Sequence, residues 1–174
     1  DFAVKIVTTV LLQFYWINLQ SSLVLYSKFL TINRGEKSVI ISVPKEIMSG
    51  ENRVACVPDV VPKLIKAGYE VQIEKNAGLS AGFTDEQYQK AGAKIIDNLT
   101  DLYANADLVF KVQRPIDHPT AGKHEIDLMK KGTILISFVY VLHYSSIAKK
   151  CAEKGIDLIS MDMIPRTTLA QKMD

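Results

Sequence analysis

Basic and polar side chains gather where short apolar segments of the chain end. Examples are PKE at 44–46 and ENR at 51–53, NAGLSAG at 76–82, KVQRP at 111–115 and DMIPR at 162–166. In parallel α/β sheets, ligands bind beyond the carboxyl ends of the strands, and guanidinium and ammonium groups there can hold anions. The pattern indicates a site for an anionic substrate or a partner surface. The alternative that stays open is that each charge only caps or solvates a loop.

The glycines exclude the two common phosphate-cradling motifs. None of the nine glycines lies two residues from another, so a G-x-G-x-x-G fingerprint is impossible, and no Gly-Lys-Ser/Thr occurs. We interpret the spacing of Gly78 and Gly82 as a tight strand-to-helix connection. If the protein handles a dinucleotide, its pyrophosphate therefore has to bind outside this chain.

Cysteine, histidine and net charge narrow the function further. Cys56 and Cys151 have no CxxC spacing, which favours a reducing compartment and argues against a disulfide or a zinc site. His118, His124 and His143 share no metal-ligand spacing, so we predict no metal. The 21 basic and 19 acidic residues leave a net charge of +2, which gives no electrostatic basis for a nucleic-acid partner.

Strand and helix patterns alternate from about residue 38 onward. Short apolar segments at 39–43, 69–73, 94–96, 107–112, 133–138 and 156–159 predict strands. Between them we predict helices capped by Asp59 and ending at Gly68, opened by a Thr84 capping box and closing at Gly92, and spanning 98–104, 125–130 and 145–154. The connections are too long for hairpins. The sequence therefore predicts an α/β fold, a mostly parallel doubly wound sheet with helices on both faces.

The first 37 residues form a separate hydrophobic extension and linker. No charge occurs from Ile6 to Ser27, between Lys5 and Lys28, and about 20 apolar residues suffice to cross a bilayer. Polar residues dilute this stretch: Thr8, Thr9, Gln13, Asn18, Gln20, Ser21 and Ser22. Targeting segment, membrane anchor and packing helix remain three open hypotheses. Because the chain opens with Asp1, we expect a processed protein or a fragment of a larger enzyme.

Several motifs in fixed order resemble one family. They are VPKEI at 43–47, ENRVA at 51–55, GYEV at 68–71, AG at 77–78, AGA at 91–93, KVQRP at 111–115 and GTILISF at 132–138. From Ser38 to Asp174 the chain is similar to the N-terminal domain shared by alanine dehydrogenase and the NAD(H)-binding alpha component of proton-translocating nicotinamide nucleotide transhydrogenase. By this resemblance, residues 38–174 are such a domain, incomplete at its C-terminus.

Particular positions favour the transhydrogenase branch. Alanine dehydrogenases carry a histidine after the strand that corresponds to 133–139, where this chain has Tyr140. The segment 161–174 resembles the transhydrogenase loop whose Arg, Gln and Asp surround the nicotinamide, which implies catalytic and cofactor-binding roles for Arg166, Gln171 and Asp174. The chain departs from the transhydrogenase pattern after Tyr140, where VLHY at 141–144 replaces a Pro-Ala-Gln-Asn-like run.

Arg53 and Lys111, with Tyr140, are possible residues of the domain cleft. In the dehydrogenase branch the matching basic residues hold the substrate carboxylate, so an alanine-dehydrogenase-like enzyme would use Arg53 and Lys111 to bind pyruvate. In the transhydrogenase branch the two residues have a structural role or line the cleft. A non-catalytic interaction domain is the third hypothesis.

The resemblance implies an enzyme that transfers hydride between NAD(H), bound by this component, and NADP(H), bound by another domain. Its implied partners are a downstream Rossmann domain, a membrane domain and an NADP-binding domain of the same enzyme, and the component pairs as a homodimer. The implied location is the mitochondrial inner membrane or the bacterial plasma membrane, with this domain on the soluble side. Alone, the chain is expected to be inactive.

Overall fold

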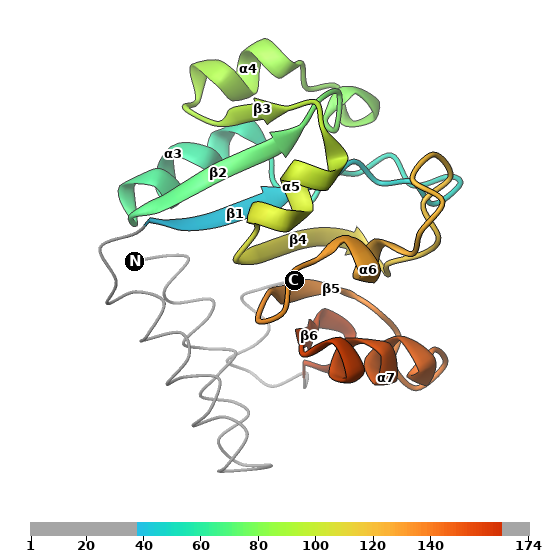
Figure 1. The fold of residues 1–174 in the computed structure, drawn as a ribbon. Helices are drawn as coiled ribbons and strands as arrows, with labels where there is room; N and C mark the ends of the chain where they lie inside the picture. The colour runs from blue at the N-terminus through green and yellow to red at the C-terminus, as the bar shows by residue number, and fades with distance from the viewer. Residues whose placement is uncertain (1–37, 165–174) are drawn as a thin grey trace.

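Six short apolar segments pair side by side into one parallel sheet in the computed structural model, which describes residues 38–164 (Figure 1). The sheet order is β3-β2-β1-β4-β5-β6, and every neighbouring pair is parallel. The strands are β1 (Val39–Val43), β2 (Tyr69–Glu74), β3 (Lys94–Ile96), β4 (Leu108–Gln113), β5 (Ile134–Phe138) and β6 (Asp157–Ser160). The predicted α/β fold with a parallel, doubly wound sheet is confirmed.

Helices cover both faces of this sheet. One face carries α3 (Val61–Lys66) and α4 (Asp85–Lys90), whose Leu64 and Tyr88 share a buried cluster with Ile41 of β1 and Ile73 of β2. Val39, Ile41 and Val43 of β1 belong to this cluster, whereas Ser42 faces the other way and donates to Leu102 O at 3.0 Å. Alternate residues of a strand point to opposite faces, which is why one strand can contribute to both layers.

The opposite face carries the three later helices, α5 (Leu99–Asn105), α6 (Glu125–Leu128) and α7 (Ser145–Lys154). Tyr103, Ile126 and Cys151 of these helices pack with Val109 of β4 and Leu135 of β5 in a second buried cluster. In Figure 1, α5 crosses in front of the sheet and α3 lies behind it. The chain therefore changes face after β3, as a doubly wound sheet requires.

Two helices begin with a side-chain cap at or next to the position predicted from the sequence. Thr84 forms the expected capping box, because its hydroxyl accepts from Gln87 N while the Gln87 side chain accepts from Thr84 N at 2.8 Å. The Asn98 side chain accepts from Thr100 N at 2.9 Å and Asp101 N at 3.3 Å, so the next helix begins one residue later than expected. Side-chain acceptors of this kind satisfy N–H groups that a helix leaves unpaired.

The predicted cap at Asp59 is wrong. Asp59 lies inside a 3-10 turn, η1 (Pro58–Val60), and α3 starts at Val61 without a side-chain cap. The third residue after Asp59 is Pro62, which has no N–H to donate to a capping carboxylate. Pro62 itself lies in the first turn of α3, where a proline is tolerated because the N–H groups of that turn have no acceptor within the helix.

Gly78 makes the tight connection predicted after the second strand. It precedes a 3-10 turn, η2 (Leu79–Ala81), that leads into α4. A Cβ atom at Gly78 would lie 2.6 Å from Tyr88 Cε2 and 2.9 Å from the Phe83 carbonyl oxygen. The close approach of these two neighbours therefore requires glycine, and no phosphate cradle has to be invoked.

Within residues 38–164, no helix is both long enough and apolar enough to span a membrane. The same residues contain no group of three or more His, Cys, Asp or Glu side chains placed to hold a metal ion. The hydrophobic extension of residues 1–37 and the predicted site residues Arg166, Gln171 and Asp174 lie outside the described residues.

Candidate functional site at the switch point of the sheet

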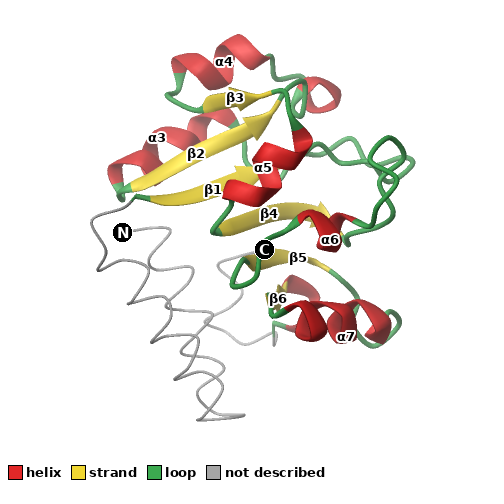
Figure 2. Ribbon diagram, viewed as in Figure 1, coloured by secondary structure: helices red, strands yellow, loops and turns green. Residues whose placement is uncertain are grey.

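The carboxyl ends of β1 and β4 lie next to each other where the sheet order reverses. From β1 the chain winds outward through β2 to β3, then returns to β4 and winds outward through β5 to β6. Ligands of open α/β sheets bind in the crevice at such a switch point. The loops after β1 and β4 meet beyond this edge (Figure 2), so the polar segments singled out from the sequence gather in one place.

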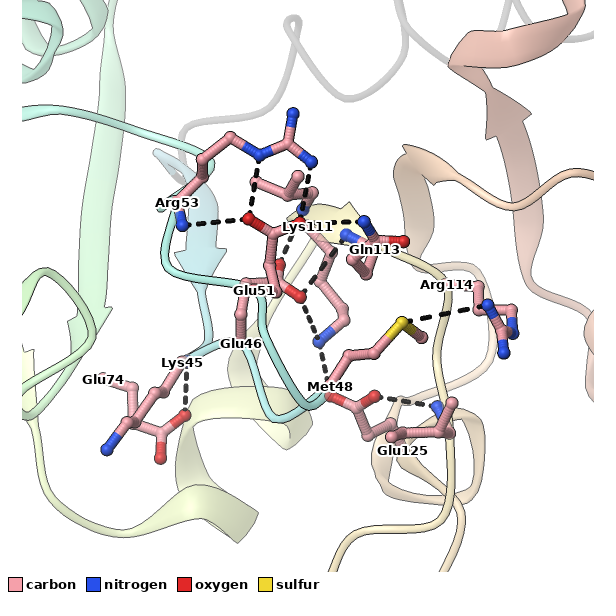
Figure 3. A network of polar contacts seen from close by, with 12 residues as sticks. Lys45, Glu46, Met48, Glu51, Arg53, Glu74, Lys111, Gln113, Arg114 and Glu125 are labelled. Atoms are coloured by element: carbon pink, nitrogen blue, oxygen red, sulfur yellow. Dashed lines mark hydrogen bonds and ion pairs between the residues drawn. The ribbon is translucent and has the colours of Figure 1, made fainter. Parts of the chain in front are cut away.

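Lys111 of β4 lies at the buried base of this edge. Its Nζ atom lies 2.8 Å from Glu125 Oε1 and 3.5 Å from Glu46 Oε2, and the three side chains are only 1–3% exposed. Figure 3 shows the ammonium group between the two carboxylates. A buried charge needs close partners of opposite sign, and here one cation has two. Lys111 is thus buried within the domain, and its charge is paired there.

The two carboxylates also bind groups other than Lys111. Glu125 at the start of α6 accepts from Tyr103 Oη at 2.6 Å and from Ile116 N at 3.0 Å. Burial, followed by the nearby Glu125 charge, raises the pKa of Tyr103 well above its ordinary value, so its hydroxyl stays a donor. These contacts tie α5, α6 and the loop after β4 to a single buried charge cluster.

Glu46 joins the loop after β1 to the end of β4. Its carboxylate accepts from Val112 N at 2.6 Å and from Gln113 N at 3.3 Å, where the β4–β5 register shifts. Burial raises the pKa of Glu46, while Lys111 and the two backbone donors act in the opposite direction. The carboxylate therefore positions the backbone on both sides of the switch point.

Arg53 forms a local ion pair on the outer side of the same loop. Its Nε and Nη2 atoms donate to the two oxygens of Glu51 at 2.8 and 2.7 Å, and Gln113 Nε2 donates to Glu51 at 2.8 Å (Figure 3). The hydrogen bonds from Arg53, ahead of that from Gln113, lower the pKa of Glu51 to about 2. The Arg53 side chain is 66% exposed, but its charge is already paired with a carboxylate.

Arg114 bridges three loops at this edge. Its guanidinium carbon lies 3.9 Å from the centroid of the Tyr144 ring, and its Nη1 atom lies 3.8 Å from Met48 Sδ. A guanidinium stacked on an aromatic face is held in one plane while its edge stays available for hydrogen bonds. The loops after β1, β4 and β5 thus form one connected rim.

Tyr140 lies two residues beyond β5, at the position that distinguishes the two branches, and has an unusual backbone. Its φ of 56° is left-handed, which is uncommon for a residue with a side chain. Its N–H and that of Val139 donate to Asp162 Oδ1, each at 3.0 Å. The Tyr140 side chain is 43% exposed. The pKa of Arg53 is raised mainly by its hydrogen bonds to Glu51, with a smaller electrostatic influence from Tyr140. Strained backbone of this kind is common at functional sites.

The structure brings Arg53, Lys111 and Tyr140 to one edge of the sheet but gives them different surroundings. Arg53 and Tyr140 border the rim, whereas Lys111 is buried. Sequence reasoning did not single out five further residues that organise the edge: Glu46, Tyr103, Gln113, Glu125 and Asp162. Glu46, Gln113 and Asp162 lie in the polar segments noted after the strands, whereas no local signal marks Tyr103 or Glu125.

Comparison with known proteins identifies relatives of both kinds. A family profile described as "Alanine dehydrogenase/PNT, N-terminal domain" matches residues 42–174. The alpha subunit of NAD(P) transhydrogenase from Cereibacter sphaeroides is 40% identical over 134 residues, which is 77% of this chain and 24% of that protein. Alanine dehydrogenase 1 from Staphylococcus aureus is 37% identical over 133 residues, covering 76% of this chain and 34% of that protein.

Solved structures agree with these relatives. A transhydrogenase from Sinorhizobium meliloti has a TM-score of 0.69 at 32% identity and covers 78% of this chain and 38% of that one. An L-alanine dehydrogenase has a TM-score of 0.62 at 33% identity and covers 70% and 32%. The chain therefore spans about a quarter to two fifths of the length of the proteins it matches.

Proposed function

Since this chain belongs to the alanine dehydrogenase/PNT N-terminal domain family, we propose that the intact protein is a transhydrogenase that transfers hydride between NAD(H) and NADP(H). The residues described here form one side of the NAD(H) cleft. NAD(H) binds to this component, and NADP(H) binds to another domain. We propose further that the intact enzyme translocates protons across the mitochondrial inner membrane or the bacterial plasma membrane.

The surroundings of Lys111 carry the choice between the two branches. An alanine dehydrogenase that used Arg53 and Lys111 to hold pyruvate would need both cations free to meet a carboxylate. The Lys111 side chain is 1% exposed and is held by Glu125 and Glu46. A substrate carboxylate would have to displace a buried carboxylate and would leave a second one beside it. That exchange is unfavourable in a site of low dielectric.

Arg53 supports the same choice. Its Nε and Nη2 atoms are bonded to the two oxygens of Glu51, and the neutral side chain of Gln113 also donates to Glu51. The rim therefore carries two neutral side chains with hydrogen-bonding groups, Gln113 and Tyr140, besides a charge that is already paired. Such groups suit an uncharged carboxamide better than a carboxylate. The nicotinamide end of NAD(H) fits this rim, whereas the described residues have no glycine-rich cradle for its pyrophosphate.

Hydride transfer requires the protein to position the two nucleotides and does not require it to transfer a proton. The nicotinamide ring carries the hydride itself, and transfer requires the donor and acceptor carbons at about 3–3.5 Å and correctly faced. In this proposal Gln171 binds the carboxamide with its donor and acceptor, Arg166 holds the loop or a phosphate, and Asp174 anchors Arg166. None of the three exchanges a proton with the substrate.

The partners follow from the share of each relative that the chain covers. A downstream Rossmann domain would bind the pyrophosphate and adenosine, and a membrane domain and an NADP-binding domain would complete the enzyme. The component is proposed to pair as a homodimer. Isolated, the chain should lack measurable NADH affinity, because its sequence has no glycine-rich motif to hold the pyrophosphate.

The substitution Gln171→Asn in the intact protein tests the assigned role. We expect hydride transfer from NADH to an NADP⁺ acceptor to fall by about a hundredfold, because a small misplacement of the ring is costly, while the Kd for NADH changes little. Gln89→Asn on the exposed side of α4 is the matched control and should leave both quantities unchanged. Unchanged turnover in Gln171→Asn refutes the role of Gln171, and an intact protein that binds no NADH by calorimetry favours the interaction-domain hypothesis.

A further inference from the structure

Asp162 collects three hydrogen bonds on a single oxygen. Its Oδ1 atom accepts from Val139 N and Tyr140 N, each at 3.0 Å, and from Ser160 Oγ at 2.5 Å. Ser160 Oγ in turn accepts from Val139 N at 3.3 Å. Asp162 lies in the 3-10 turn η3 (Met161–Met163) directly after β6, and it therefore connects the carboxyl ends of β5 and β6.

The backbone of Tyr140 has the conformation that this carboxylate requires. Two successive N–H groups can converge on one anion when the backbone turns through a left-handed residue, and Tyr140 has a φ of 56°. This conformation is unfavourable for a tyrosine, because its Cβ atom lies too close to the following carbonyl oxygen. The carbonyl of Tyr140 accepts from His143 N at 2.8 Å and from Tyr144 N at 3.0 Å, so the turn continues toward the residue that stacks on Arg114.

A second carboxylate holds the neighbouring strand in the same way. Glu46, after β1, accepts from Val112 N and Gln113 N at the end of β4, and Asp162, after β6, accepts from Val139 N and Tyr140 N beyond the end of β5. In each case the carboxylate comes from an adjacent strand and fixes two successive N–H groups at the rim. Of the two residues whose backbones end these pairs, Gln113 donates to Glu51, and Tyr140 exerts a small electrostatic influence on Arg53.

We propose that Asp162 is a positioning residue for hydride transfer: it holds the left-handed backbone of Tyr140 so that the side chain of Tyr140 borders the nicotinamide. This inference rests on the proposed function and names a residue that the family resemblance did not supply. Asp162 does not touch the cofactor; it acts through Tyr140. In sequence Asp162 lies four residues before Arg166, which is outside the described residues.

A purely structural role would leave a different signature. If Asp162 only stabilised the fold, its loss would lower the free energy of unfolding but leave kcat of the folded enzyme intact. If it positions Tyr140, its loss frees the backbone amides of residues 139 and 140 and lowers kcat, with little effect on the affinity for NADH. The two readouts, amide exchange and kcat against Kd, therefore separate the two roles.

The test uses Asp162→Ala, Asp162→Asn and Asp162→Glu in the intact protein, with Asp59→Asn as control, because Asp59 is exposed and makes no capping bond. In Asp162→Ala we expect the amides of Val139 and Tyr140 to exchange about tenfold faster or more, because an ionic acceptor is lost. We expect kcat for hydride transfer to fall by about ten- to a hundredfold and the Kd for NADH to stay within about twofold. Asp162→Asn keeps an acceptor without the charge, so its kcat should lie between those of Asp162→Ala and the unsubstituted enzyme. Asp162→Glu should retain most of kcat.

Different results would contradict the positioning role of Asp162 and the proposed transhydrogenase function. An Asp162→Ala or Asp162→Asn enzyme with normal kcat, or one whose kcat falls only as far as its folded fraction falls, overturns the positioning role. Unchanged exchange at residues 139 and 140 overturns the contact itself. An unsubstituted protein that binds no NADH overturns the proposed function, and the exchange measurement still decides whether Asp162 holds the loop.

Discussion

Lys111 Nζ lies 2.8 Å from Glu125 Oε1, and both side chains are 1% exposed. This contact places the most conspicuous basic residue of the KVQRP segment in the core. It also removes the cation that a carboxylate substrate would need, and it ties β4 to α6 beneath the rim. The function proposed for the cleft depends on this relationship as much as on the residues that face solvent.

Replacing the buried lysine should destabilise the domain strongly. Lys111→Met leaves Glu125 and Glu46 buried without a counter-ion, and loss of one partner of a buried pair costs about 3–5 kcal/mol. Urea denaturation of the chain measures this loss. Lys63→Met, at an exposed position of α3, should change stability by less than about 0.5 kcal/mol. A loss of less than about 1 kcal/mol in Lys111→Met would contradict the buried arrangement.

The Glu51–Arg53 pair should depend on pH in a defined window. The pKa of Glu51 is lowered to about 2 from an ordinary value of 4.5. A lowered carboxyl pKa contributes stability above the unfolded value and loses it as the pH falls through the folded value. The stability difference between wild type and Glu51→Gln should therefore be full at neutral pH and should shrink between about pH 4.5 and about pH 2. NMR titration of the Glu51 carboxyl checks this directly; a midpoint near 4.5 is the contradictory result.

Much of the fold was predictable because its signals are local. Apolar segments such as 39–43, the Thr84 capping box and Gly78 each depend on a few neighbouring residues, and the structure confirms them. The cap at Asp59 failed because one nearby proline removed the donor. Local patterns also pointed to the polar segments after the strands, in which Arg53 and Lys111 lie.

The inner organisation of the site was not predictable, since it depends on residues far apart in sequence. Tyr103 and Glu125 meet across 22 positions, and Glu46 reaches Val112 across 66. A lysine near the end of a strand looks the same in sequence whether it faces a cleft or a buried carboxylate. The difference lies in segments far away in the sequence, since Glu46 after β1 and Glu125 of α6 surround the Lys111 ammonium group.

Tyr140 offers a test of its own backbone. Glycine adopts a left-handed conformation without cost, whereas alanine pays about 1–2 kcal/mol. Tyr140→Gly should therefore be more stable than Tyr140→Ala by about 1 kcal/mol, and both should impair hydride transfer because both lack the ring. The two variants differ by a single Cβ and serve as each other's control in thermal unfolding. Equal stability, or a more stable alanine variant, would mean that φ at this position is not left-handed.

Gly78 tests the packing that leads into α4. A methyl group there would meet Tyr88 Cε2 and the Phe83 carbonyl oxygen at 2.6 and 2.9 Å. Gly78→Ala should lower the free energy of unfolding by about 1–3 kcal/mol, the usual cost of overpacking. Ser80→Ala in the exposed η2 turn is the control and should have little effect. Calorimetric melting of both variants settles the point, and equal melting temperatures would argue against the close approach.

The most direct measurement is an assay of the intact protein with NADH and an NADP⁺ acceptor, with and without pyruvate and ammonium. We predict hydride transfer between the two nucleotides that does not depend on pyruvate or ammonium. NADH oxidation that requires pyruvate and ammonium, with no transfer between the nucleotides, would contradict the transhydrogenase function and would assign the cleft to an amino-acid dehydrogenase.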